Sequence, residues 1–132
     1  IEYCVNILKV LIEYMNLSYV FKKNNETVFS QVKKYISKNI STPLLPKDLC
    51  KSLGVSQSTL YKVIKKNTDL SPTEFIRKMK TEKAKSLLVN TSSDVADIAE
   101  LVGIPDTNYF IRVFKKETGL SPLRYRKQYK QQ

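Results

Sequence analysis

The chain has 132 residues, enough for one compact domain or for two small lobes with an added segment. Its 23 Lys and Arg against 12 Asp and Glu give a net charge of +11, which favours a polyanion such as nucleic acid, or an anionic membrane surface, as the partner. The chain has no histidine, and Cys4 and Cys50 lie far apart, so zinc-finger spacings and histidine-based catalysis are excluded.

The first 24 residues predict a helix that is apolar on more than one side, and they carry a net charge of only +1. Such a helix needs more than one partner, which is a second copy, an upstream domain or the chain's own following lobes. The chain begins with Ile rather than Met, so we expect it to be a piece of a longer protein. Residues 22–26 (KKNNE) are predicted to be a polar linker. The two apolar stripes are Ile1, Val5, Leu8, Ile12, Met15, Tyr19 and Cys4, Leu8, Leu11, Met15.

Apolar residues at helical spacing predict the next helix, over residues 28–40, which ends at a Ser-Thr-Pro turn. Pro46 fits the first turn of a following helix over residues 47–53, because its missing N–H is not needed there. Gly54 permits a tight turn after that helix. The pattern therefore predicts two helices joined by a short proline-containing loop.

Ser56 is a good N-cap for a further helix that runs to about Asn67. Ser71 and Pro72 are an N-cap and first-position pair, and the glutamate three residues after Ser71 completes a capping box. The helix that starts there is predicted to reach Val89, a length of about 27 Å at about 1.5 Å per residue.

The last third of the chain repeats this pattern of caps and turns. Ser93 or Asp94 is predicted to cap a helix over residues 95–102, which Gly103 ends, and Asp106 or Thr107 begins a helix that ends at Gly119. Ser121-Pro122 opens a short final helix that leads into a basic tail, residues 124–130. No segment alternates as a strand does, so the fold class is predicted to be all-α.

Residues 53–75 and residues 102–125 are two copies of one pattern. Pairing Lys65-Lys66 with Lys115-Lys116 also pairs the two Leu-Ser-Pro triplets, at an offset of 50 residues. Each copy predicts a short helix, a glycine turn and a second helix, which is the outline of a helix-turn-helix. We therefore predict two lobes, at about 28–71 and 94–129, joined by a linker helix at about 72–89.

The second helix of each copy has an apolar face and a polar face. The apolar residues, predicted to anchor the helix, are Leu60, Val63 and Ile64 in the first copy and Phe110, Val113 and Phe114 in the second. Amide and arginine side chains on the polar face suit base edges, and lysines suit phosphates. The phosphate-contacting candidates are Lys65, Lys66, Lys115 and Lys116.

Structural alternatives exist for several of these residues. A Lys-Lys pair is usually a solvated helix face, and Tyr109 adjoins Phe110 and is also a candidate core residue. Arg112 is also placed to form an ion pair with Asp106 or Asp97. The matched positions of Lys62 and Arg112 in the two copies favour nucleic-acid contact.

The motifs DIAELVG and YFIRVFKKETGLSPLRYRK, with the linker stretch FIRKMKTEKAKSLL, resemble the AraC-type (AraC/XylS) transcription regulators over about residues 28–129. This resemblance implies seven helices in two helix-turn-helix lobes, binding to promoter DNA, and most often transcription activation. It implies a bacterial, cytoplasmic protein that is nucleoid-associated when bound and has RNA polymerase as a partner. It places base contacts at Gln57, Ser58, Tyr61 and Lys62 and at Thr107, Asn108, Tyr109 and Arg112.

Three other classes of function are compatible with parts of the sequence to different degrees. The alternative to DNA binding is a protein-interaction module that works through the apolar amino-terminal helix, which also offers a homodimer contact. An enzyme is disfavoured, because the sequence has no glycine-rich phosphate loop and no nucleophile beside a base. We expect no cofactor, no metal and no membrane partner, since no long uncharged apolar run is present.

Overall fold

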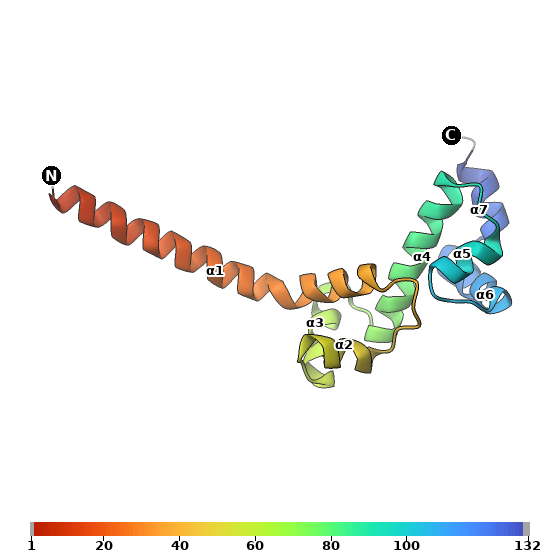
Figure 1. Ribbon diagram of the computed structural model, residues 1–132, viewed down its shortest axis with the longest axis horizontal. Coiled ribbons are helices and arrows are strands. Elements are labelled where there is room, and N and C mark those ends of the chain that lie inside the picture. The colour runs from red at the N-terminus through yellow and green to blue at the C-terminus, as the bar shows by residue number, and fades with distance from the viewer. Residues whose placement is uncertain (1, 131–132) are drawn as a thin grey trace.

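The computed structural model describes the backbone of residues 2–130 and the side chains of residues 6–13 and 28–130. In this part of the chain the regular secondary structure is all helical, without a strand, which confirms the all-α prediction (Figure 1). Its helices are α1 (Glu2–Lys38), α2 (Pro46–Leu53), α3 (Gln57–Thr68), α4 (Pro72–Asn90), α5 (Val95–Leu101), α6 (Thr107–Thr118) and α7 (Pro122–Tyr129).

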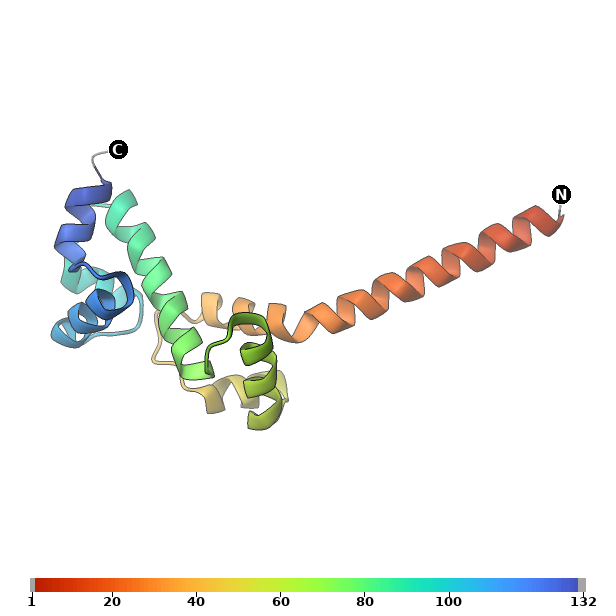
Figure 2. The ribbon, with the colours of Figure 1, turned by 180° about the vertical axis from the view of Figure 1, so that it is seen from behind.

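Helix α1 is continuous from Glu2 to Lys38, so the prediction of a polar linker at residues 22–26 is wrong. This stretch contains neither glycine nor proline, and lysine, asparagine and glutamate cost less than about 1 kcal/mol each in a helix. The amino-terminal half of α1 extends away from the rest of the molecule (Figures 1 and 2).

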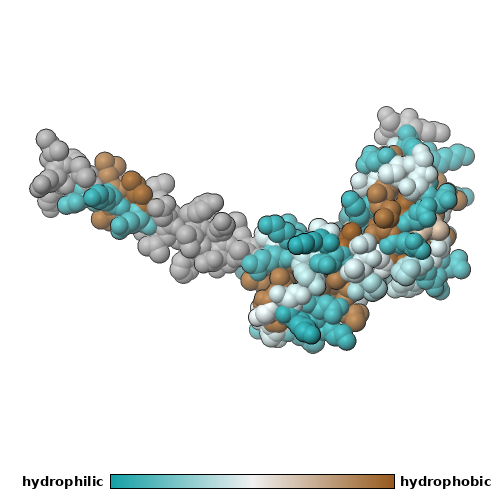
Figure 3. All heavy atoms as spheres, viewed as in Figure 1, coloured by the Kyte–Doolittle hydropathy of each residue, from teal (hydrophilic) through white to brown (hydrophobic). Residues whose placement is uncertain are grey.

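The predicted apolar stripes of α1 lie partly outside the described side chains. The side chains of Cys4 and Tyr19 are among those outside the described part. Leu8, Leu11 and Ile12 are described, and each is more than half exposed. Figure 3 shows this apolar group on the projecting helix. The chain's own lobes therefore do not cover residues 6–13.

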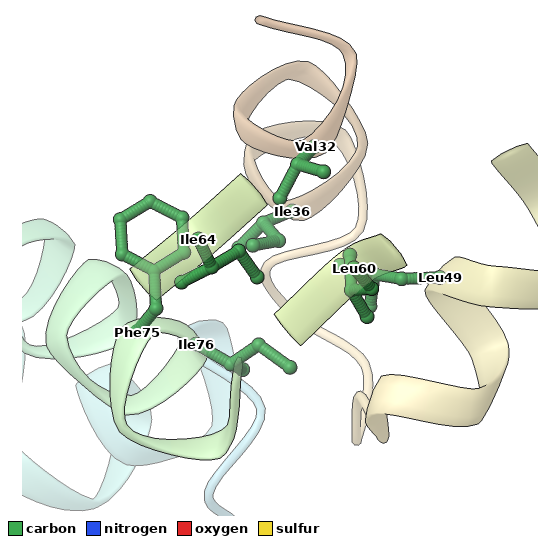
Figure 4. Packing of buried hydrophobic residues seen from close by; sticks show 7 residues of the cluster. All are labelled: Val32, Ile36, Leu49, Leu60, Ile64, Phe75 and Ile76. Atoms are coloured by element: carbon green, nitrogen blue, oxygen red, sulfur yellow. The ribbon is translucent and has the colours of Figure 1, made fainter. Parts of the chain in front are cut away.

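Lobe one is built around seven buried apolar side chains contributed by four helices (Figure 4). The carboxyl-terminal part of α1 and the start of α4 enclose α3, so that Leu60 and Ile64 are completely buried. This arrangement confirms the predicted anchoring face of α3, except that Val63 is only half-buried. The cluster consists of Val32, Ile36, Leu49, Leu60, Ile64, Phe75 and Ile76.

Lobe two has a separate core on the other end of α4. Phe114 of α6 is fully buried and lies edge-on to Tyr125 of α7, with ring centroids 5.4 Å apart. All three predicted anchors of α6 are buried. The cluster consists of Ala84, Leu88, Ile98, Ala99, Val102, Phe110 and Phe114.

The predicted caps account for where most helices begin. Ser56, Ser71 and Ser121 each accept a backbone N–H three residues on, as does Asp106 at the start of α6. Glu74 completes the capping box of α4 by accepting the N–H of Ser71 at 3.1 Å. Helix α5 begins after Asp94, whose side chain makes no capping bond. The helix boundaries are thus largely local properties of the sequence.

The ends of α3 and α6 share one backbone conformation but not one residue type. Gly119 ends α6 with φ +82°, and Asp69 ends α3 with φ +61°; Asp69 is the non-glycine residue with a positive φ in the described chain. The left-handed region disfavours side chains, and a carboxylate at a helix carboxyl end also opposes the helix dipole. The first lobe therefore carries backbone strain that the second lobe avoids.

Replacing Asp69 by glycine is expected to raise the free energy of unfolding by about 0.5–1 kcal/mol, because the left-handed cap is then unstrained. The reciprocal Gly119→Asp variant should lose a similar amount, since a Cβ at Gly119 would meet no atom within 4 Å and only the backbone would be strained. Urea denaturation followed by circular dichroism measures both. A loss of stability in Asp69→Gly would contradict the argument.

Candidate nucleic-acid interface

The outward face of α3 carries the four residues predicted for base contact in lobe one. Gln57, Ser58 and Lys62 are exposed, and the Tyr61 ring is 47% exposed. Because Leu60 and Ile64 are buried on the opposite side, the helix presents this polar face as a fixed surface.

Helix α6 presents the corresponding face in lobe two. Asn108 and Arg112 are exposed, Thr107 is half-buried, and Tyr109 is 44% exposed, so Tyr109 is not a core residue. The Arg112 guanidinium lies over the Tyr109 ring, 5.8 Å from its centroid. The alternative ion pair is absent, since within the described side chains Arg112 has no carboxylate within 4.0 Å.

The four predicted phosphate-contacting lysines are exposed in the last turns of α3 and α6. Lys65 differs from the others, because its Nζ donates a hydrogen bond to the backbone oxygen of Asp69 at 3.0 Å. This bond helps to satisfy the carboxyl end of α3. Contact between Lys65 and a phosphate would therefore compete with helix capping.

Helices α3 and α6 lie on the same side of the molecule, one on each side of α4. Both face the viewer in Figure 2. Helix α4 has 19 residues, one more than predicted. The structure thus places the two helices that carry the predicted polar faces on the same side of the molecule.

Part of the basic tail forms contacts inside lobe two that the sequence did not predict. Arg126 donates to the backbone oxygens of Leu88 and Ser93 at 2.9 and 2.6 Å, and Lys130 donates to that of Thr91 at 2.9 Å. Helix α4 has no basic residue in its own last turn, so these cations from α7 and its end complement the helix dipole. They add to lobe stability.

Lys80 was not among the predicted functional residues, and it is 4% exposed at the middle of α4. Its Nζ donates to three backbone oxygens, those of Ile40, Thr42 and Val102, at 2.8, 2.7 and 2.9 Å. Burial lowers the pKa of Lys80 from 10.5 to about 8. Its position four residues from both Ile76 and Ala84 is the sequence signal that places it on the buried face of α4.

An open cleft of about 150 Å³ separates the two lobes on one side of α4. Leu45 of lobe one and Tyr109 of lobe two line its walls, and Arg77 and Lys80 of α4 are among the residues at its base. Within the described side chains, no group of three His, Cys, Asp or Glu residues is placed to hold a metal ion. In the same part of the chain, no helix has the length and apolar character needed to cross a bilayer.

Two helix-turn-helix lobes on a shared helix define a class of DNA-binding domain. The family described as "Helix-turn-helix domain" matches residues 49–128. The chain is 33% identical to the carboxyl-terminal domain of AraT, a response regulator from Geobacillus stearothermophilus, with a TM-score of 0.72 over 78% of this chain and 86% of that one.

Two further relatives extend the comparison. The Msm operon regulatory protein of Streptococcus mutans is 36% identical over 124 residues, which cover 92% of this chain but 45% of that protein. The DNA-binding domain of AdpA, solved in complex with a target DNA, shares the fold with a TM-score of 0.71 at 19% identity, over 77% of this chain and 92% of that one. The chain belongs to the AraC-type helix-turn-helix family. It spans less than half the length of the curated relatives that it matches.

Proposed function

We propose that this domain binds double-stranded promoter DNA by placing α3 and α6 in successive major grooves on one face of the duplex. The observation that carries the proposal is a pair of helices on the same side of the molecule (Figure 2), each anchored by buried residues at equivalent positions. Helix α4 is about 28 Å long at about 1.5 Å per residue, close to the roughly 34 Å between successive grooves. A mismatch between the two lengths is met by bending the DNA, at a cost of about 1–6 kcal/mol.

The base contacts are assigned to exposed or half-buried residues in the first two turns of each recognition helix. Arg112 has the geometry to pair with guanine through two hydrogen bonds, and Gln57 and Asn108 can do so with adenine. Tyr61 and Tyr109 present half-exposed rings to sugar or to a thymine methyl group. Ser58, Lys62 and Thr107 complete the set.

The whole protein is proposed to be a bacterial transcription activator rather than an enzyme. Relatives include the lactose operon transcription activator of Staphylococcus xylosus, 34% identical over 92 residues. We infer that it contacts RNA polymerase at the promoter and is associated with the nucleoid when it is bound to DNA. The five exposed apolar residues of α1, Ile7, Leu8, Val10, Leu11 and Ile12, support a homodimer contact through this helix.

The function is tested by selecting bound sites from a random duplex library. We expect an enriched site with two short conserved elements, whose complex resists competition by unrelated DNA better than non-specific complexes do. Equal competition by unrelated DNA and by the selected site would overturn sequence-specific binding.

Replacing Lys66 or Lys116 by alanine is expected to weaken binding to all DNA sequences alike. Each lost phosphate contact should reduce the slope of log K against log salt by about 0.9. Fluorescence anisotropy over a salt series, with a selected and an unrelated duplex, measures this slope. Lys9→Ala, an exposed change on the projecting part of α1, is the matched control and should leave the slope unchanged. A loss of affinity for the selected site alone would mean that these lysines read sequence.

A further inference from the structure

Lys80 lies on one face of α4 between the cores of the two lobes. Ile76 belongs to the core of lobe one and Ala84 to the core of lobe two, each four residues from Lys80. Residues four apart share a helix face, so this face of α4 passes from one apolar core to the other through a single buried charge. The boundary between the lobes is therefore marked by an ammonium group.

The three acceptors of this ammonium come from both lobes. The oxygens of Ile40 and Thr42 belong to the loop after α1, in lobe one, and the oxygen of Val102 follows α5, in lobe two. An ammonium has three N–H donors, which equals the number of acceptors. Hydrogen bonds from a charged donor are stronger than neutral ones, so Lys80 ties the two lobes together at one point.

Gly103 shows how closely the two backbones approach at this point. A Cβ at Gly103 would lie 2.5 Å from the Lys80 Nζ, 2.6 Å from the oxygen of Thr42 and 2.8 Å from that of Ile40. Its φ of +71° also favours glycine. We call Lys80, Gly103 and the three carbonyl groups the interlobe joint.

The lobes are less closely packed beside this joint, where the cleft lies. The helices of each lobe pack mainly on one another and on α4. Leu45 and Tyr109 face the cleft between the lobes and remain 52% and 44% exposed. The interlobe joint is therefore a direct contact between lobes that otherwise share α4.

We propose that Lys80 is a positioning residue that fixes the distance between α3 and α6, and so sets the spacing between the two DNA elements that the domain accepts. The part of this inference that concerns DNA rests on the proposed function. Without the ammonium, the three carbonyl groups turn to water and each lobe can shift relative to the other as α4 bends. The domain then tolerates DNA elements at other spacings.

The first test needs no DNA. Residual dipolar couplings of the full chain are expected to fit one alignment tensor for both lobes in the wild type and in Lys83→Met, an exposed change on the same helix. Lys80→Met keeps the side-chain length but removes the donors, and its two lobes should need different tensors. A single tensor in Lys80→Met would overturn the inference.

The second test uses the selected site and versions of it with one base pair added or removed between the two elements. The wild type and Lys83→Met should lose about tenfold or more in affinity for the altered spacings, and Lys80→Met less than about threefold. A merely structural lysine would lower the melting temperature without changing these ratios, and equal losses in all three proteins would overturn the proposal. If the wild type prefers no sequence, the proposed function fails, while the tensor comparison still decides the role of Lys80 in lobe geometry.

Gly103→Ala is a second variant that is expected to disrupt the interlobe joint. Its methyl group would force the interlobe joint apart while leaving the ammonium in place. We expect this variant to accept a wider range of spacings between the two DNA elements, as Lys80→Met does. It replaces Lys80→Met in both tests if Lys80→Met loses its helical circular dichroism signal. Strict wild-type spacing in a folded Gly103→Ala protein would count against the joint.

Discussion

Replacing Phe114 by alanine is expected to lower the free energy of unfolding by about 3–5 kcal/mol, which is enough to unfold lobe two in a marginally stable domain. The ring is fully buried and packs against Phe110 and Tyr125, with centroids 5.8 and 5.4 Å away. Its removal leaves a cavity that the short helices around it cannot close. Urea denaturation, followed by the resolved amide signals of each lobe, measures the loss.

Leu123→Ala is the matched control in the same lobe. Leu123 is apolar and lies in the first turn of α7, but it is 66% exposed. Its truncation should change the free energy of unfolding by less than about 0.5 kcal/mol. Similar losses in both variants would show that burial at Phe114 does not support lobe two.

Replacing Arg112 by alanine is expected to cost about 1–3 kcal/mol of binding free energy at the selected site and to relax the preference at one base pair. The guanidinium is exposed, has no carboxylate partner among the described side chains and is held beside the Tyr109 ring. We therefore expect it to form two parallel hydrogen bonds to guanine. Site selection with the variant protein measures the preference at each position.

Arg112→Lys and Arg124→Ala separate base reading from charge. Lysine keeps the positive charge but lacks the planar fork, so Arg112→Lys should recover non-specific affinity without the base preference. Arg124 is an exposed arginine on α7, outside the two recognition helices, and its loss should leave every preference intact. An unchanged preference at every position in Arg112→Ala would remove Arg112 from the base-reading set.

Helix starts and turns could be predicted because they depend on neighbouring residues. The pairs Ser71-Pro72 and Ser121-Pro122 each begin a helix, and each serine accepts a capping hydrogen bond from the backbone three residues on. The left-handed cap at Asp69 was also predictable, since its counterpart is Gly119. The anchors of α3 and α6 followed from helical spacing in the same local way.

Contacts between distant segments could not be predicted in this way. The sequence shows that Lys80 shares a helix face with apolar residues, but its acceptors are 22 to 40 residues away and are backbone oxygens, which every residue possesses. The same holds for Arg126, which the sequence places in a basic tail. In the structure it donates a hydrogen bond to the backbone oxygen of Leu88, in the last turn of α4. Backbone acceptors leave no mark in the residue pattern.

The linker error has a different origin. Residues 22–26 are polar, which is typical of a loop, but lysine, asparagine and glutamate are also tolerated in a helix. The absence of glycine and proline between Glu2 and Lys38 was the better guide. The assignment of individual residues to base contacts or to phosphate contacts stays a prediction.

The continuity of α1 makes it a lever on lobe one. Its 37 residues extend over about 55 Å at about 1.5 Å per residue, and its last turns hold Val32 and Ile36, both fully buried. The helix is unbroken between these two residues and its far end. A force applied near Leu8 would therefore be transmitted along α1 to Val32 and Ile36, which pack in the core of lobe one.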